Sequence, residues 1–448
     1  MTLADTLSTK LAQRTKKLAA LEPYRIDGRV TELVGMVVQA TCPRGSVGDL
    51  CTIEVEGGKP IRAEVMGFRE GKMLLMPLDA TTGVAVGSRV ILGTKALTIP
   101  VGPKLLGRII DGMGRPIDGK GPIQATSYRS VYNPSPDPMS RKMISEPFTT
   151  GIRSIDGLLT IGLGQRIGIF SGSGVGKSVL LGMIARHTSA PVNVIGLIGE
   201  RGREVREFIE RDLGEEALKR SVVVVATSDQ AAQIRVKSAM VTTTIAEYFR
   251  DEGKDVMLLM DSLTRVAMAQ REIGLAIGEP PTTKGYTPSV FALLPRLLER
   301  AGTNSHSSIT GLYSVLVESD DLNDPIADAA RSVLDGHIVL SRPMANRGHY
   351  PAVDVLQSVS RLRHDITDKT QVGNVQRVVE LLSVYRESED LINIGAYSPG
   401  SNPKIDEAVA NIDIINAYLR QDGDFRSDFE SARHELAQLC DQLGAPRG

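Results

Sequence analysis

Residues 166–186 read RIGIFSGSGVGKSVLLGMIAR, and this stretch decides the fold. An apolar run, Ile167 to Phe170, leads into closely spaced glycines and then into an apolar helical pattern, which predicts a strand, a loop and a helix. Glycines let the backbone curl so that successive N–H groups face phosphate oxygens, and the helix N-terminus adds a partial positive charge. We therefore interpret this loop as a phosphate-binding loop, with candidate contacts at Gly172, Ser173, Gly174, Val175, Gly176, Lys177, Ser178 and Val179.

Two side chains of the loop suit a nucleoside triphosphate bound with Mg²⁺. The Lys177 ammonium can reach the β- and γ-phosphates, and the Ser178 hydroxyl can ligate the metal. The strict G-x-x-x-x-G-K-[ST] pattern asks for glycine at position 171, where this chain has Ser171. The departure is mild, because the turn-forming glycines, the lysine and the serine all stand in register.

Two further apolar runs end in charged residues. Val256 to Met260 precedes Asp261, which we expect at the carboxyl end of a buried strand, where it would hold Mg²⁺ through water. Residues 192–198 deliver Glu200 and Arg201 at the edge where ligands bind in open α/β sheets. A carboxylate there can polarise an attacking water, and an arginine can stabilise γ-phosphate charge. The alternative is a surface cluster of Glu and Arg residues.

Composition excludes several classes of protein. The 448 residues carry 52 Lys+Arg against 53 Asp+Glu, a balance that argues against a basic nucleic-acid coat over the whole surface. The three cysteines, Cys42, Cys51 and Cys440, form no C-x-x-C pair, so neither a zinc site nor a disulfide framework is expected. Since no apolar run reaches 18 residues and no secretory signal is evident, we expect a cytoplasmic protein.

The texture of the chain changes three times, which predicts four segments. Residues 1–24 form an amphipathic helical segment, and 25–97 contain five or six short β-rich runs typical of a small β-barrel. From 98 to 370 a connector rich in Gly and Pro is followed by apolar runs alternating with helical stretches, which indicates an α/β domain with a mainly parallel sheet. Residues 371–448 are helical in pattern.

The first segment has a leucine stripe and a cluster of basic residues. Leu3, Leu7, Leu11, Leu18 and Leu21 share one helical face, and Lys10, Arg14, Lys16 and Lys17 crowd the middle. Such a segment either packs on its own domain or docks a partner or an anionic membrane surface. The residues from 370 onward carry a net charge of −6.

Four strings together resemble the catalytic subunits of F-type rotary ATP synthases and their relatives. They are SGSGVGKS, IGERGREV, LLMDSLTR and YPAVDVLQSVSR, and the resemblance covers about residues 25–440. It implies an N-terminal β-barrel, a RecA-like P-loop NTPase core, a C-terminal helical domain and a ring of six subunits. It also implies that Glu200 activates water, that Arg201 adjoins the γ-phosphate and that Asp261 belongs to the metal shell. Tyr350 matches the aromatic that stacks on adenine, and Arg361 the arginine supplied by the neighbouring subunit.

Within that family the finer resemblance is to the export ATPases of type III secretion, and GSGVGKS and GAYSPGSNPKID are similar to their flagellar branch. The resemblance implies Mg-ATP hydrolysis by a homohexamer that energises export of flagellar proteins. The partners it implies are a stator-like regulatory protein at the N-terminal helix, a coiled-coil stalk protein, export substrates and their chaperones. It implies a cytoplasmic location with peripheral association with the inner membrane at the export apparatus.

Other functions stay open on the sequence. They are an injectisome ATPase, a rotary ATP synthase catalytic subunit, a non-catalytic ring subunit and an RNA-translocating helicase. A helicase should carry basic, aromatic-bearing barrel strands, whereas residues 28–95 hold one aromatic, Phe68, and no strong basic cluster, so we expect no nucleic-acid partner. Non-catalytic relatives typically lack a carboxylate at the position of Glu200. Phe425 and Phe429 are candidates for a second adenine-contacting aromatic.

Overall fold

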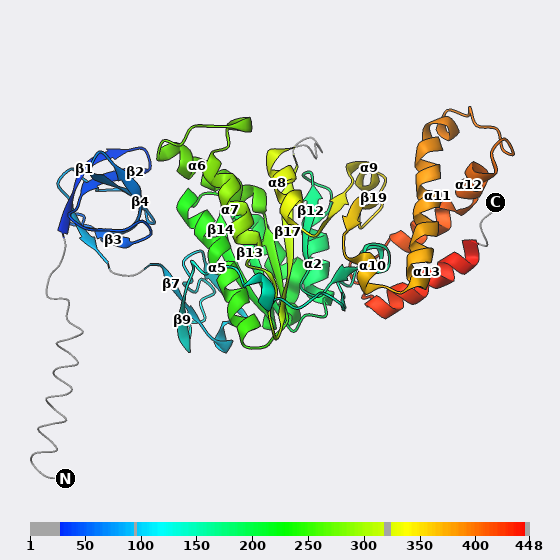
Figure 1. Cartoon of the computed structure of the whole chain (residues 1–448), viewed down its shortest axis with the longest axis horizontal. Helices are drawn as coiled ribbons and strands as arrows, with labels where there is room; N and C mark the ends of the chain where they lie inside the picture. Colours follow the sequence, from blue (N-terminus) through cyan, green and yellow to red (C-terminus); the bar gives the residue numbers. More distant parts are fainter. Residues whose placement is uncertain (1–26, 94–95, 318–323, 444–448) are drawn as a thin grey trace, which may run out of the picture. The chain divides into compact units, whose positions relative to one another are not determined.

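A computed structural model describes residues 27–93, 96–317 and 324–443, and the chain divides into two compact units between residues 97 and 98 (Figure 1). The amphipathic helix predicted for residues 1–24 lies outside the described residues. Among the described residues, no helix is long and apolar enough to cross a membrane.

The first unit is a closed barrel of six antiparallel strands, in the order β1-β2-β5-β4-β3-β6. Successive side chains of a strand point to opposite faces, so the alternating apolar positions fill the interior. Val38, Ala40, Ile53 and Leu75 are fully buried there. The predicted β-barrel is confirmed. Its strands are β1 (Asp27–Val34), β2 (Val37–Thr41), β3 (Leu50–Ile53), β4 (Ile61–Arg69), β5 (Lys72–Pro77) and β6 (Arg89–Leu92).

The second unit is built on a nine-stranded sheet in the order β19-β18-β12-β17-β15-β13-β14-β8, with β16 paired to β17. All neighbours are parallel except β19 and β16, as predicted from the continuous apolar runs. The strands are β8 (Arg108–Asp111), β12 (Arg166–Ser171), β13 (Val192–Glu200), β14 (Ser221–Thr227), β15 (Val256–Asp261), β16 (Gly302–Thr303), β17 (Ser308–Leu316), β18 (Gly336–Leu340) and β19 (Val353–Ser360).

Helices cover both faces of this sheet, with α5 and α7 on one side and α2 on the other (Figure 1). The helices around the sheet are α2 (Lys177–His187), α3 (Gly202–Glu207), η4 (Phe208–Leu213), α4 (Gly214–Lys219), α5 (Ala232–Asp251), α6 (Leu263–Ala276), α7 (Pro288–Leu298), α8 (Pro325–Val333), α9 (Arg342–Asn346) and α10 (Arg363–Ile366). Shorter pieces are β7 (Thr98–Val101), η1 (Pro103–Leu105), β9 (Ser127–Ser130), η2 (Pro138–Ser140), β10 (Pro147–Phe148), η3 (Ile155–Leu159), β11 (Ile161–Gly162) and η5 (Thr283–Gly285).

In the described residues, three long helices follow α10: α11 (Lys369–Asn393), α12 (Pro403–Leu419) and α13 (Phe429–Leu443). The Asp368 side chain caps α11 by accepting from the Gln371 N–H, and Asn402 caps α12 by accepting from the Lys404 N–H. The three helices pack on one another, and α13 also packs on η3. The predicted helical C-terminal domain is confirmed.

One part of the predicted connector belongs to the sheet. Residues 108–111 form β8, which pairs in parallel with β14 and ends the sheet on that side. The Arg108 guanidinium is fixed there by Asp118, with Nε and Oδ2 2.6 Å apart. The rest of the connector forms turns and the two-stranded sheet of β7 and β9.

Candidate nucleotide-binding and catalytic site

The loop of residues 172–176 joins β12 to α2 at the carboxyl edge of the parallel sheet. Gly174 and Gly176 have φ angles of 78° and 87°, which favour glycine because residues with a Cβ atom rarely adopt them. Ser171 is the last residue of β12, and its carbonyl accepts from the Val317 N–H at 3.0 Å. Position 171 therefore needs no glycine, which explains why the departure from the strict pattern is tolerated.

Three charged side chains converge beside this loop. Glu200 ends β13 and Asp261 ends β15, and the two strands are parallel neighbours with Leu197 opposite Asp261. The Lys177 ammonium contacts Asp261 Oδ1 and lies 3.8 Å from Glu200 Oε1. The side chains of Lys177, Glu200 and Asp261 are only 11%, 16% and 4% exposed, so their charges interact with little screening by water. Adjacent strands therefore bring together a cation and two carboxylates from three distant segments.

The surroundings of Glu200 change its acidity. Burial of the carboxyl group and the negative charge of Asp261 raise the pKa of Glu200 to about 7, although Lys177 opposes the shift. A carboxyl group with a pKa near neutrality is a better proton acceptor than an ordinary glutamate.

Asp261 has a further partner that the sequence analysis did not identify. Ser314 on β17 is buried, and its Oγ donates to Asp261 Oδ1 at 2.5 Å. Nearby, the Thr264 hydroxyl on α6 accepts from the Leu316 N–H at 2.9 Å and so ties the start of this helix to the end of β17. Ser314 is one of several hydroxyl residues in this strand, so the sequence neither distinguishes it nor gives its partner.

A cavity of about 390 Å³ adjoins the phosphate-binding loop. Tyr350 lines it, is 46% exposed, and lies so close to Gly176 that a Cβ at that glycine would meet its ring at 3.2 Å. Val179 and Gln421 also line this cavity, whereas Phe425 and Phe429 do not. Phe425 lies instead with its ring 5.7 Å from the Arg153 guanidinium carbon. The space beside Tyr350 suits a flat aromatic ring such as a nucleobase.

Gln421 was also missed by the sequence analysis. Its Oε1 accepts from the Arg153 N–H at 2.8 Å, and its Nε2 donates to the carbonyls of Gly151 and Phe425. Its own N–H donates to the Tyr350 carbonyl at 3.0 Å. This buried amide therefore fixes the wall of the cavity to the segment that follows α12.

The two candidate arginines lie away from the charged cluster. The Arg201 side chain is 80% exposed and lies 3.5 Å from Glu204, so the structure does not bring it to Lys177. Arg361 follows β19, and its guanidinium donates to the Arg331 carbonyl at 3.1 Å. Ser360 pairs with Gly336 at the start of β18, whereas Ser171 pairs with Leu340 at the end of β18. Arg361 is therefore at the amino ends of the parallel strands, whereas its own phosphate-binding loop lies at their carboxyl ends.

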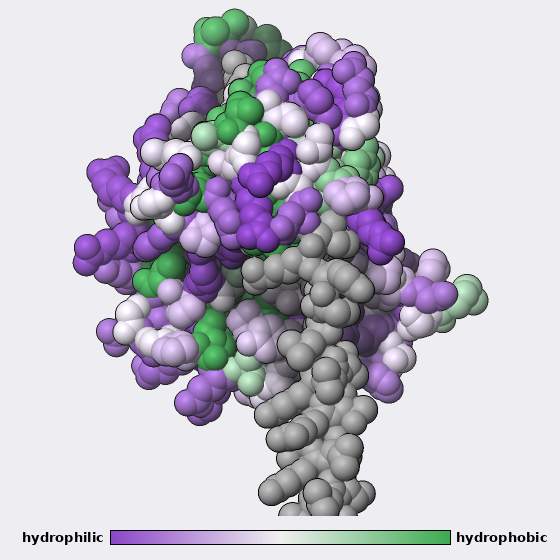
Figure 2. All heavy atoms as spheres, turned by 90° about the vertical axis from the view of Figure 1, so that its left-hand side faces the viewer, coloured by the Kyte–Doolittle hydropathy of each residue, from purple (hydrophilic) through white to green (hydrophobic). Residues whose placement is uncertain are grey.

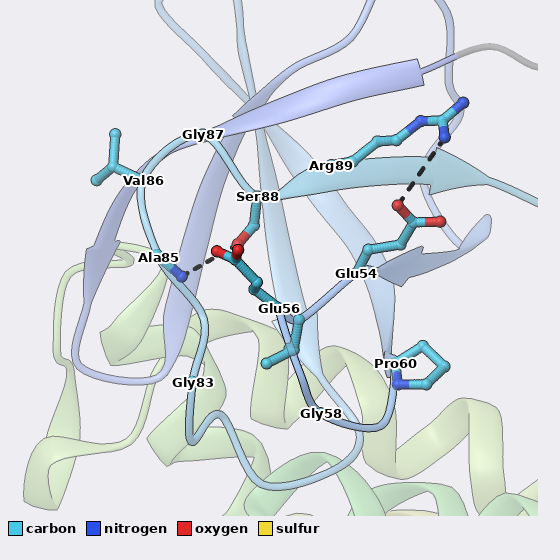
Figure 3. A pocket seen from close by; sticks show the side chains of 11 residues that line it. Glu54, Glu56, Gly58, Pro60, Gly83, Ala85, Val86, Gly87, Ser88 and Arg89 are labelled. Carbon is cyan, nitrogen blue, oxygen red and sulfur yellow. Dashed lines mark hydrogen bonds and ion pairs between the residues drawn. The ribbon is translucent and has the colours of Figure 1, made fainter.

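The barrel has a separate cavity of about 670 Å³ (Figure 3). Glu54 and Arg89 face each other across one side of it, with Oε2 and NH1 3.9 Å apart, and the Ser88 hydroxyl accepts from the Ala85 N–H. Among the residues that the structure describes, no aromatic side chain lines it. The face shown in Figure 2, which includes the barrel, has small separate hydrophobic groups among hydrophilic residues. This cavity lacks the stacking rings and excess positive charge of a single-strand nucleic-acid site.

The fold and the site define a P-loop nucleotide-binding protein, since a glycine-rich loop, its lysine and two strand-end carboxylates meet at one edge of a parallel sheet. Residues 30–92 match the β-barrel domain of the ATP synthase alpha/beta family, and residues 151–360 match its nucleotide-binding domain. Residues 367–438 match the C-terminal domain of the type III secretion ATPase EscN. The chain belongs to the ATP synthase alpha/beta family.

Relatives that match over nearly their whole length show which members of this family the chain resembles. The chain is 56% identical over 420 residues to the flagellum-specific ATP synthase of Bacillus subtilis, covering 93% of this chain and 96% of that protein. It is 48% identical to a type 3 secretion system ATPase of Sinorhizobium fredii, with 92% of each chain covered. A solved structure of the assembled ATPase EscN from enteropathogenic E. coli matches with a TM-score of 0.88 at 44% identity, over 92% of this chain and 99% of that one.

Proposed function

We propose that this chain hydrolyses Mg-ATP as a subunit of a homohexameric ring and so energises export of flagellar proteins through a type III secretion apparatus. The observation that carries the proposal is the convergence of Lys177, Glu200 and Asp261 beside the phosphate-binding loop. Its relatives over nearly the whole chain are named flagellum-specific ATP synthases and type 3 secretion system ATPases.

Lys177, Glu200 and Tyr350 have distinct parts in the proposed reaction. The backbone N–H groups of the loop and the Lys177 ammonium bind the triphosphate, and Lys177 must then turn from Asp261 to the phosphates. Glu200 accepts a proton from the water that attacks the γ-phosphorus, and its raised pKa suits this part. The Tyr350 ring stacks on the base.

The residues present fit a magnesium ion. Mg²⁺ prefers oxygen ligands and keeps several waters, and the site offers the exposed Ser178 hydroxyl and Asp261 Oδ2, which accepts no hydrogen bond from the residues that the structure describes. Ser178 would bind the metal directly and Asp261 through water. When bound, the metal neutralises charge on the phosphates.

The position of Arg361 supports a ring. An arginine that completes a phosphoryl-transfer site is often supplied by a neighbouring chain. Arg361 lies at the amino ends of the parallel strands, away from its own Lys177, which supports a role in the site of a second copy. The exposed Arg201 belongs to the proposal only if its side chain turns inward when nucleotide binds.

The flagellar branch rests on two high identities. Flagellum-specific relatives from Bacillus subtilis and Pseudomonas aeruginosa are 56% and 51% identical to this chain. Type 3 secretion relatives are 48% and 49% identical, and flagellum-specific relatives from Salmonella typhimurium and Aquifex aeolicus are 47% and 44% identical. Glu200 argues against a non-catalytic subunit, and the cavity of the barrel argues against an RNA-translocating helicase.

We also propose the partners that the resemblance implies. A solved structure of EscN in complex with its central stalk EscO matches this chain with a TM-score of 0.85, which supports a stalk-like partner. A stator-like regulator at the N-terminal segment, export substrates with their chaperones, and peripheral association with the inner membrane from the cytoplasm complete the proposal.

Replacing Glu200 by glutamine tests the proposed function. Glu200→Gln keeps the shape of the side chain but removes the base, so we expect turnover to fall by on the order of 10²–10⁴ while nucleotide affinity stays unchanged. The measurements are steady-state ATP hydrolysis and binding of a fluorescent ATP analogue. Glu216→Gln is the matched control, since this side chain on α4 is 86% exposed and pairs with Lys219, and the variant should hydrolyse ATP normally. Near-normal hydrolysis by Glu200→Gln would reject the role of this residue.

A further inference from the structure

Ser314 is a buried polar residue that the proposed mechanism does not use. It lies on β17, which runs between the strand of the phosphate-binding loop, β12, and the strand of Asp261, β15. In register, Ser314 is opposite Ile169 on β12, and its neighbour Tyr313 is opposite Met260 on β15. Ser314 therefore lies between the strand that leads into the phosphate-binding loop and the strand that carries Asp261.

The two oxygens of Asp261 have unequal surroundings. Oδ1 accepts from both the Lys177 ammonium and the Ser314 hydroxyl, the latter at 2.5 Å. Within the described residues, Oδ2 accepts from neither and has no other hydrogen bond. A hydroxyl on Oδ1 thus fixes the rotation of the carboxylate and leaves Oδ2 available.

Binding of a triphosphate changes this balance. The Lys177 ammonium is needed at the phosphates, so Asp261 loses its cationic partner when the nucleotide enters. Ser314 is then the donor that still holds Asp261, a residue only 3% exposed to water. A buried carboxylate without a donor is costly and is free to rotate away from its working orientation.

We propose that Ser314 is a positioning residue that holds Asp261 in place for the hydrated Mg²⁺ of the nucleotide after Lys177 has moved to the phosphates. The inference rests on the proposed function, because it assumes that Asp261 belongs to the metal shell. Partners that orient a metal-shell ligand in this way typically change metal affinity about 10- to 100-fold when they are removed.

The test separates the affinity for nucleotide from the gain in affinity that Mg²⁺ provides. We expect Ser314→Ala to bind ATP without Mg²⁺ as the wild-type protein does. Its gain in ATP affinity on addition of Mg²⁺ should be about 10-fold smaller, and half-maximal hydrolysis should need about 10-fold more Mg²⁺. Ser314→Thr keeps the hydroxyl and should retain most of the wild-type gain. Calorimetry with and without Mg²⁺ measures the affinities.

Thr310→Val is the matched control. Thr310 is also buried on β17, four residues earlier on the same face, but its hydroxyl accepts from the Gly164 N–H away from the site. Thermal unfolding of each variant checks that it folds, and Ser314→Cys replaces Ser314→Ala if the alanine variant does not.

Three outcomes would overturn the inference. Ser314→Ala with the wild-type gain from Mg²⁺ rejects the role of Ser314 and leaves the proposed function intact. An equal loss in Thr310→Val shows that β17 is merely perturbed. A wild-type protein that gains nothing from Mg²⁺ rejects the metal-shell assignment of Asp261, and with it the proposed function.

Discussion

Glu200 is the residue whose surroundings bear most directly on the proposed chemistry. An ordinary glutamate is ionised throughout the neutral range, but burial and the nearby charge of Asp261 raise the pKa of Glu200 to about 7. A raised pKa means that the protonated form persists to higher pH, and a protonated carboxyl group cannot accept a proton from water. If Glu200 is the base of the proposed reaction, hydrolysis depends on pH in the physiological range.

We predict that kcat/KM for ATP rises with pH through a midpoint near 7, because the fraction of ionised Glu200 increases there. The measurement is a pH–rate profile at saturating Mg²⁺, with thermal unfolding recorded at each pH to confirm that the protein stays folded. The residual activity of Glu200→Gln should lack this rise. A wild-type profile that is flat across neutrality would contradict the assignment of Glu200 as the base.

For single residues, the sequence predicts the position of those that belong to a short local motif. Glu200 and Asp261 each close an apolar run, and Lys177 ends a glycine-rich loop before an apolar helical pattern, so local patterns are enough to predict that two lie at strand ends and one at a helix start. Ser314 and Gln421 act through residues 53 and 270 positions away, and no local pattern records such contacts. Arg201 shows the reverse case, since its motif predicts a place at the phosphates while its side chain extends into solvent.

At the scale of elements, the parallel strands could be predicted because each is a continuous apolar run buried on both faces. Strand β8 was missed since it spans four residues, Arg108–Asp111, between two glycines, and a run this short looks like a turn. Its place at the sheet edge depends on pairing with β14, far along the chain. Pairing partners of this kind are not written in local sequence.

The segment after α12 gives a prediction at the same scale. Gln421→Ala removes the hydrogen bonds that join this segment to Gly151 and Arg153, and a buried group left without a partner costs about 1–3 kcal/mol. Since Gln421 also borders the cavity beside Tyr350, we expect KM for ATP to rise several-fold, with a smaller change in kcat. Steady-state kinetics and thermal unfolding measure the two effects.

Gln438→Ala serves as the control for Gln421→Ala. Gln438 lies on the exposed side of α13, and its Nε2 is 2.9 Å from Nε2 of the exposed His434. It should leave both KM and stability close to wild type. If Gln421→Ala loses stability but keeps the wild-type KM, then the segment is structural and does not shape the nucleotide cavity.

At the scale of the whole molecule, the N-terminal segment carries a prediction that rests on sequence alone, because residues 1–26 lie outside the described part of the chain. Each buried leucine would contribute about 1.5–3 kcal/mol, so three or four could hold a partner helix at micromolar affinity. We expect deletion of residues 2–20 to leave nucleotide binding intact, to abolish binding of the regulator and to weaken association with anionic vesicles. A pull-down, vesicle sedimentation and calorimetry measure these effects. A truncated protein that melts several degrees lower yet still binds the regulator would support packing on its own domain instead.

The ring itself provides the last prediction. Arg361 and Lys177 lie at opposite ends of the parallel strands of one sheet. In the proposed ring, a complete site therefore takes Glu200 from one copy and Arg361 from the next. Arg361→Ala should therefore lower turnover by roughly 10³-fold or more with little change in nucleotide affinity. Glu200→Gln should be inactive for a different reason, since its defect lies on the other side of the interface.

Mixing the two inactive variants tests whether Arg361 acts in the site of the neighbouring copy. In a mixed ring, some interfaces pair an intact Glu200 with an intact Arg361 from the neighbouring copy, so activity should return in part. Each variant alone should stay inactive at every concentration, and wild-type activity should rise more than linearly with protein concentration, because the site forms only on assembly. A native mass spectrum can verify that the variants exchange into common rings. If they do exchange and every mixture remains inactive, Arg361 does not act across the interface. This residue must then serve the fold of its own subunit, through its hydrogen bond to the Arg331 carbonyl.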